Sequence, residues 1–133
     1  MSETIEEVIY VDDSPDDRLF AEHLHKRGGY RFRLSLFDGG PAALRDLARR
    51  IEEGRPLPAL LVADHYMPPI EGPELLRLIR ADPAFAGIGL AICSGGDDPE
   101  DQRAAREAGA SFLLEKPLDL DLCRQILDRR NHG

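Results

Sequence analysis

The sequence predicts an α/β fold, a three-layer sandwich built on a doubly wound, five-stranded parallel sheet. Two observations predict this class. Short apolar runs alternate with helical patterns along the chain, and the β-α unit occurs five times. Strands that alternate with helices at this spacing form parallel sheets, which right-handed crossovers cover on both faces. The length of 133 residues fits one domain.

The first strand is expected at residues 8–11, a short apolar run rich in β-branched residues. The helix after it is expected to begin at Pro15, because Ser14 suits the N-cap and proline suits the first helical position. Its buried stripe is expected to consist of three large apolar residues, Leu19, Phe20 and Leu24. The glycine pair Gly28-Gly29 ends the helix.

Residues 30–37 alternate apolar and polar side chains, which is the period-two pattern of an edge or half-exposed strand. The second helix is expected at about residues 41–53, closed by Gly54. Residues 59–63 form the most apolar strand of the chain, and Asp64 stands at its carboxyl end.

The remaining elements continue the alternation. We expect a helix at about 73–81, a strand at 88–93, a helix at 99–108, a strand at 112–115 and a last helix at 119–130.

The composition indicates a globular protein without a membrane segment. Apolar residues make up 42% and charged residues 32% of the chain, and no apolar run approaches the roughly 20 residues that cross a bilayer. The acidic N-terminus lacks the basic start and apolar core of a secretory signal, so we expect a cytoplasmic protein without membrane insertion. The net charge of −8 argues against direct DNA binding, which depends on basic residues that neutralise phosphates.

Polar residues follow four of the five expected strands. They are Asp12 and Asp13 after the first strand, Asp64 after the third, Ser94 after the fourth and Lys116 after the fifth. In open α/β sheets the functional crevice lies outside the carboxyl ends of the strands. Three carboxylates in one crevice repel one another, so a cation stabilises them, and oxygen-only ligands favour Mg²⁺.

This group of residues suits phosphoryl transfer. Asp64 is the candidate nucleophile towards phosphorus, as in ATPases that form an aspartyl phosphate. Mg²⁺, Lys116 and the Ser94 hydroxyl would each hold one oxygen of the transferred group.

Four segments together resemble the receiver domains of response regulators in two-component signalling. They are VDDS at 11–14, DHYMPPIEG at 64–72, Ser94 and EKP at 115–117. The intervals between the acceptor, the serine and the lysine are also usual for that family. The resemblance implies the flavodoxin-like strand order 2-1-3-4-5 and a stand-alone receiver similar to the chemotaxis regulators. We expect one domain over residues 1–133, with an ordered core at about 5–130 and no output domain.

The resemblance also implies a role for each site residue. Asp13 would bind Mg²⁺ directly, Asp12 mainly through water, and Asp64 both as ligand and as phosphoacceptor, with the backbone carbonyl of Tyr66 as the remaining protein ligand. The peptide bond between Lys116 and Pro117 is expected to be cis.

The partners follow from the same resemblance. A sensor histidine kinase or a histidine-phosphotransfer protein would supply the phosphoryl group. The face made by the fourth helix, fifth strand and fifth helix would then change its binding of a downstream target protein. Such a domain is not an enzyme, since it assists only its own phosphorylation and dephosphorylation.

The sequence departs from the family pattern in its switch region. Leu113 stands where an aromatic residue commonly reports the phosphorylation state, and Phe112, one residue earlier, is predicted to face the other side of the sheet. The Gly95-Gly96 segment is the predicted moving loop. Tyr66 is expected at the mouth of the pocket, where we hypothesise that it shields the acyl phosphate from water. His65 is interpreted as a loop residue without a chemical role.

Three other functions stay open. A phosphorelay shuttle or phosphate sink would use the same chemistry and differ only in its output. A phosphatase with an aspartyl nucleophile usually has a second aspartate two residues later as general acid, and this chain has Tyr66 there. A module that acts without phosphorylation is expected to have lost an acidic residue, the acceptor or the lysine, and all of these are present.

Overall fold

The computed structural model describes residues 5–132, which contain one five-stranded parallel sheet in the order β2-β1-β3-β4-β5. The strands are β1 (Glu7–Val11), β2 (Arg33–Phe37), β3 (Leu60–Asp64), β4 (Gly89–Ser94) and β5 (Phe112–Glu115). The helices are α1 (Pro15–Gly28), α2 (Gly40–Glu53), α3 (Gly72–Arg80), the short 3₁₀ helix η1 (Pro83–Phe85), α4 (Pro99–Ala108) and α5 (Leu120–His132). The predicted fold class and strand order are confirmed. The predicted domain limits at residues 1 and 133 lie outside the described residues.

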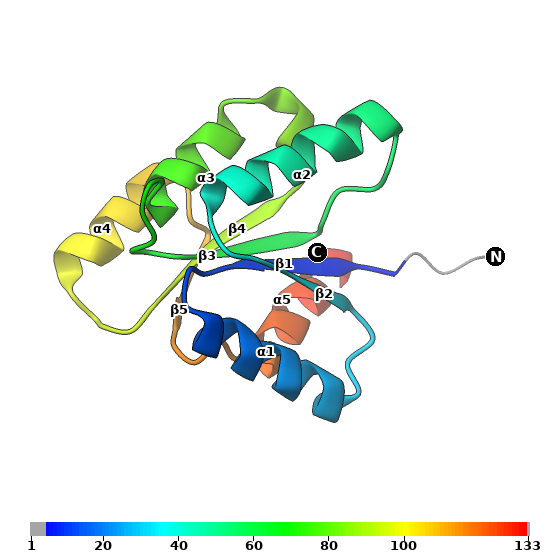
Figure 1. The fold of residues 1–133 in the computed structure, drawn as a ribbon, viewed down its shortest axis with the longest axis horizontal. Coiled ribbons are helices and arrows are strands. Elements are labelled where there is room, and N and C mark those ends of the chain that lie inside the picture. Colours follow the sequence, from blue (N-terminus) through cyan, green and yellow to red (C-terminus); the bar gives the residue numbers. More distant parts are fainter. Residues whose placement is uncertain (1–4, 133) are drawn as a thin grey trace.

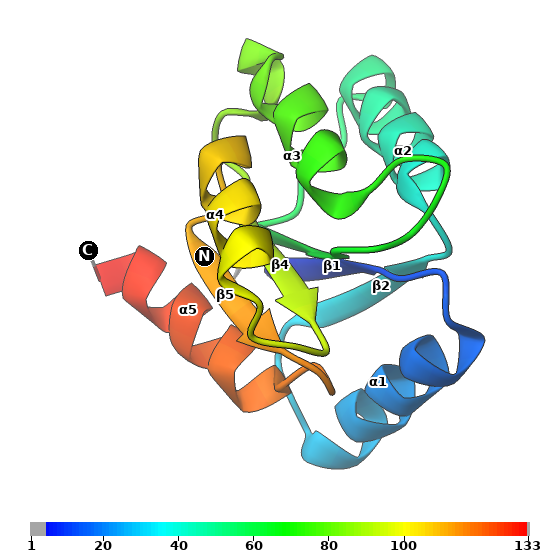
Figure 2. The same ribbon diagram turned by 90° about the vertical axis from the view of Figure 1, so that its left-hand side faces the viewer.

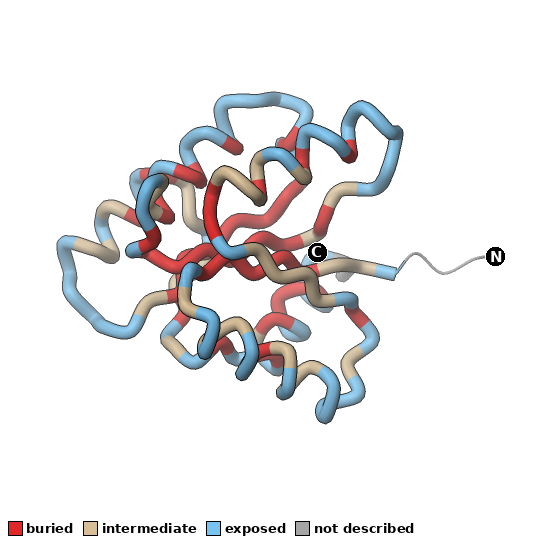
Figure 3. Tube along the Cα trace, in the orientation of Figure 1, coloured by how far each residue is buried: buried red, intermediate tan, exposed pale blue. Residues whose placement is uncertain are grey.

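The sheet forms the middle layer. Helices α2, α3 and α4 cover one face, and α1 and α5 cover the other (Figures 1 and 2). Successive β1 side chains alternate between the two faces: Ile9 and Val11 pack towards α2–α4, and Val8 and Tyr10 towards α1 and α5. The sheet centre is therefore the most deeply buried part of the molecule (Figure 3).

Most predicted boundaries agree with the structure to within two residues, but β2 begins three residues later than expected. Its pairing with β1 starts at Glu7 and Arg33, and β1 itself begins at Glu7. Residues 30–32 therefore have no β1 residue to pair with. Tyr30 and Phe32 still pack against the apolar cluster under α1 and α5. No residue of β2 itself is fully buried, as expected for an edge strand.

Helix α1 begins as predicted, because the Ser14 side chain accepts a hydrogen bond from the Asp17 amide at 3.2 Å. Its buried face, however, differs from the predicted one. Leu19 is 65% exposed and Phe20 47% exposed, and the residue that is buried against the sheet is the small Ala21. Leu19 lies roughly 200° around the helix from Ala21 and so points away from the sheet. Of the predicted stripe only Leu24 packs against the core.

Three further backbone features bear on the predictions. The Lys116–Pro117 peptide bond is cis, as expected, and the Pro68–Pro69 bond is also cis, which the sequence analysis did not predict. Gly72 lies directly against the end of β3, where an added Cβ would stand 2.3 Å from the Asp64 carbonyl oxygen. Among residues 5–132, no helix has the length and apolar character that a bilayer crossing requires.

Candidate functional site

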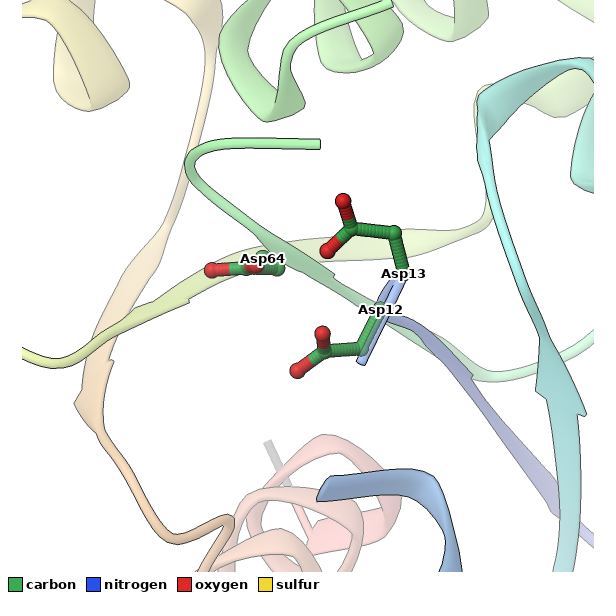
Figure 4. A group of neighbouring side chains, drawn as sticks. All are labelled: Asp12, Asp13 and Asp64. Atoms are coloured by element: carbon green, nitrogen blue, oxygen red, sulfur yellow. The ribbon is translucent and has the colours of Figure 1, made fainter. Parts of the chain in front are cut away.

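Three carboxylates meet at the carboxyl end of the sheet. Asp12 directly follows β1, and Asp64 is the last residue of the neighbouring β3, in a register that pairs Val11 with Ala63. One carboxylate oxygen from each of Asp12, Asp13 and Asp64 lies within 4.8 Å of the others (Figure 4). The structure thus brings together the three acidic residues that the sequence placed in one crevice.

Asp12 is fully buried and stays ionised. The Tyr10 hydroxyl donates a hydrogen bond to it at 2.6 Å, and the Ser14 amide donates another at 2.9 Å. Burial on its own would raise the pKa of Asp12, but these two bonds and the ammonium of Lys116 hold that pKa below its ordinary value. Asp12 therefore contributes a fixed negative charge to the site.

Lys116 follows β5 and reaches into the same crevice. Its Nζ atom lies 2.9 Å from a carboxylate oxygen of Asp17, 3.1 Å from Asp12 and 3.3 Å from Asp64. Burial would lower the pKa of Lys116, but the hydrogen bonds to Asp17 and Asp12 outweigh it and raise the pKa. The side chain is consequently a permanent cation beside Asp64.

Asp17 is a site residue that the sequence analysis missed. One feature of the sequence could have indicated it: Asp17 stands in the first turn of a helix that begins next to a functional strand end. Its pairing with Lys116 could not be predicted from a local pattern, because the two residues are 99 positions apart.

The pKa of Asp64 lies well above the ordinary value of an aspartate. Burial and the negative charge of Asp12 raise its pKa to about 6, against the opposing effect of Lys116. Burial, and after it the neighbouring negative charge, thus disfavour the ionised form of Asp64.

A divalent cation fits this set of donors. The cluster offers only carboxylate oxygens, which are the ligands that Mg²⁺ prefers. The residues that would hold the cation are Asp12, Asp13 and Asp64, and its charge would offset the repulsion among them.

The Ser94 hydroxyl hydrogen-bonds within its own loop. Ser94 follows Cys93, which is the register partner of Asp64, so its backbone lies beside the site. Its hydroxyl donates to the Gly96 carbonyl at 3.1 Å. Engagement of a group on Asp64 therefore requires this hydroxyl to give up that bond.

The two residues after Asp64 connect the site to α4. Tyr66 is 59% exposed, and its hydroxyl donates a hydrogen bond of 2.6 Å to Asp101 in α4. His65 is buried, and its Nε2 lies 3.7 Å from the same Asp101 oxygen. The interpretation of His65 as a plain loop residue overlooked this burial. His65 also borders a cavity of about 80 Å³ under α4, which Ser94 and Leu113 line as well.

Strand β5 carries its aromatic residue on the predicted face. Phe112 packs with the cluster under α1 and α5, and Leu113 packs with the cluster under α2, α3 and α4. The side of β5 that faces α4 therefore carries an aliphatic side chain.

Comparison with known proteins gives a consistent family. The family model of the response regulator receiver domain matches residues 8–128. A two-component response regulator of Oryza sativa is 30% identical over 111 residues, covering 84% of this chain and 71% of that protein. The gliding motility regulatory protein of Myxococcus xanthus is 31% identical over 123 residues, which cover 92% of this chain but 15% of that protein.

Solved structures agree with the sequence relatives. A response regulator receiver protein from Pseudomonas putida is 26% identical with a TM-score of 0.71, and the match covers 96% of this chain and 99% of that one. A response regulator in its Mn²⁺-bound form is 25% identical with a TM-score of 0.72, covering 87% and 84% of the two chains. A two-component response regulator from Legionella pneumophila shares the fold, with a TM-score of 0.80 at 22% identity over 98% of this chain and all of the other.

Proposed function

This chain belongs to the response regulator receiver family, and on that premise we propose that it accepts a phosphoryl group on Asp64 in a Mg²⁺-dependent reaction. The observation that carries the proposal is the meeting of Asp12, Asp13, Asp64 and Lys116 at the carboxyl end of the sheet. Receiver domains are signalling domains, so the product of the reaction is a changed state of the protein.

In the proposed step a carboxylate oxygen of Asp64 forms a bond to the phosphorus of a phosphohistidine. The bond from phosphorus to the imidazole nitrogen breaks, and its electron pair leaves with that nitrogen. Lys116, which lies 3.3 Å from an Asp64 oxygen, stabilises the negative charge on one equatorial oxygen. The Ser94 hydroxyl leaves the Gly96 carbonyl to hold a second oxygen.

A bound Mg²⁺ would neutralise charge on the acidic cluster and on the transferred group. We propose that Asp13, Asp64 and the backbone carbonyl of Tyr66 hold it directly, and Asp12 mainly through water. The acidic cluster and its oxygen-only chemistry support this assignment.

The phosphoryl group would come from a sensor histidine kinase or a histidine-phosphotransfer protein. Output would pass through the face of α4, β5 and α5 to a downstream target. Support for this route lies in the contacts of Asp101 in α4 with Tyr66 and His65, which directly follow the proposed acceptor.

The test is to incubate the protein with Mg²⁺ and a small acyl phosphate and to measure the intact mass. We expect the wild type to gain one phosphoryl group, and expect chelation of Mg²⁺ to abolish the gain. Asp64→Asn should gain none. Asp38→Asn is the matched control, because Asp38 follows β2 as Asp64 ends β3 but lies outside the acidic cluster. A wild type that gains no phosphoryl group, or an Asp64→Asn variant labelled as fully as the wild type, contradicts the proposal.

A further inference from the structure

Lys116 has a carboxylate partner outside the acidic cluster. The Nζ atom lies closer to Asp17, at 2.9 Å, than to Asp12 or Asp64. Asp17 belongs to the first turn of α1, whereas Asp12 and Asp64 stand at the strand ends. A lysine ammonium has three N–H donors. The hydrogen bond to Asp17 occupies one of these donors, so a phosphoryl oxygen that takes this donor must displace Asp17.

The partners differ in how readily they release Lys116. Asp12 is fully buried, and an ionised carboxylate in such a position loses much when a cationic partner leaves it. The Asp17 side chain is 37% exposed, so water can replace the ammonium around it. The contact between Asp17 and Lys116 is consequently the one most easily exchanged for a contact with a phosphoryl oxygen.

We propose that Asp17 is a positioning residue that restrains Lys116 towards α1 and thereby raises the donor concentration needed to phosphorylate Asp64. The inference rests on the proposed function, since it concerns the same transfer to Asp64. Asp17 acts through Lys116 and touches neither Asp64 nor the donor. Its negative charge competes with the donor's phosphoryl oxygens for one ammonium. The competition ends when Lys116 turns from Asp17 to the phosphoryl group.

The first experiment measures the rate of phosphorylation of Asp64 against the concentration of a small acyl phosphate. Asp17→Asn keeps the size of the side chain and removes its charge. We expect the concentration for half-maximal rate to fall about twofold to fivefold, which corresponds to the loss of one partly exposed ion pair, with the maximal rate little changed. A purely structural role for Asp17 would not improve the use of the donor.

Asp16→Asn is the matched control. Asp16 lies in the same helical turn, is exposed and carries the same charge. It is not one of the carboxylates that pair with Lys116 in the described part of the chain. We expect its half-maximal concentration to stay near that of the wild type. An equal fall in both variants would mean that net charge near the pocket, rather than the contact with Lys116, sets the donor requirement, and this would overturn the proposal. An unchanged or higher value in Asp17→Asn would overturn it too.

A second experiment needs no phosphorylation. This experiment is a double-mutant cycle that compares the midpoints of urea unfolding of the wild type, Asp17→Asn, Lys116→Met and the double variant. A second cycle replaces Asp17→Asn with Asp16→Asn. We expect the shifts to be non-additive for Asp17 with Lys116 and additive for Asp16 with Lys116. Additive shifts in both cycles would show that Asp17 and Lys116 do not interact, and would overturn the proposal. The variants at Asp17 and Lys116 can show coupled stability while the wild type takes up no phosphoryl group. In that case the proposed function fails, and the contact between Asp17 and Lys116 stands.

Discussion

Tyr66 lies two residues after the proposed acceptor, Asp64. Its ring is exposed to solvent, and it lies at 4.5 Å from the buried ring of His65. The hydrogen bond to Asp101 raises the pKa of Tyr66 to about 12, so its hydroxyl remains a donor at neutral pH. The side chain is therefore held in place at one end by a ring contact and at the other by α4.

If the Tyr66 ring limits the access of water to the acyl phosphate, then Tyr66→Ala should shorten the lifetime of phosphorylated Asp64 severalfold. Tyr66→Phe keeps the ring and removes only the bond to Asp101, so it should stay close to the wild type. The measurement is the loss of the phosphorylated intact mass over time after the donor is removed. Equal lifetimes for Tyr66→Ala and the wild type would exclude shielding by the ring.

At this scale the sequence predicts some residues well and others poorly. Asp12, Asp64 and Lys116 could be placed because each directly follows or ends an apolar strand, and parallel strands bring their carboxyl ends to one edge. Asp17 and His65 could not be placed in the same way. Their contacts depend on the rotation of a helix and on the path of a loop, and neither leaves a periodic pattern in the sequence.

Among the elements, α1 and α2 differ in how deeply their leucine side chains are buried. Leu19 in α1 is largely exposed, whereas Leu47 in α2 is completely buried among the side chains beneath α2, α3 and α4. The count of large apolar residues in α1 predicted the wrong face, because the helix approaches the sheet through the small Ala21. Hydrophobic periodicity thus located the helix but did not orient it.

The same substitution in the two helices should show this difference. Leu47→Ala should lower the free energy of unfolding by about 2–5 kcal/mol, since it opens a cavity in the core. Leu19→Ala should change it by less than about 0.5 kcal/mol, the range of ordinary surface substitutions. Urea unfolding of both variants checks the prediction, and a loss at Leu19 as large as that at Leu47 would contradict the orientation of α1.

Across the whole molecule, the end of the sheet opposite the site is held by Glu7 and Arg50. The buried Arg50 donates to both carboxylate oxygens of Glu7, at 2.7 and 2.8 Å, and to Asp46 at 2.8 Å. These contacts join the start of β1 to the end of α2. Burial would raise the pKa of Glu7, but the hydrogen bonds from Arg50 and Ser35 hold it below the ordinary value of 4.5. The pair lies 43 positions apart, so no local pattern predicts it.

Because the pKa of Glu7 is lowered on folding, its contribution to stability is complete above its unfolded value and is lost as the pH falls through the folded value. Glu7→Gln should therefore lower the free energy of unfolding by about 1–3 kcal/mol at neutral pH, and by less under acidic conditions. Urea unfolding at neutral and at several acidic pH values measures both effects.

Glu22→Gln serves as the control, because the one ion-pair partner of Glu22 among residues 5–132 is the exposed Lys26, at 3.4 Å. We expect it to change stability by about 0.5 kcal/mol or less at any of these pH values. A loss in Glu7→Gln that is the same at neutral and acidic pH would show that the charge of Glu7 does not stabilise the fold.

The contact between Lys116 and Asp17, which joins distant parts of the chain, also has a consequence for synthesis. A chain that has left the ribosome only as far as β4 already contains Asp12, Asp13 and Asp64 but lacks the ammonium that lies among them. A contact between residues 99 positions apart costs more chain entropy to close than a local one, and it needs both segments of the chain to be present. Uptake of a phosphoryl group would then act as a check on completeness, since only a molecule with β5 docked beside β4 presents the full set of charges to a donor.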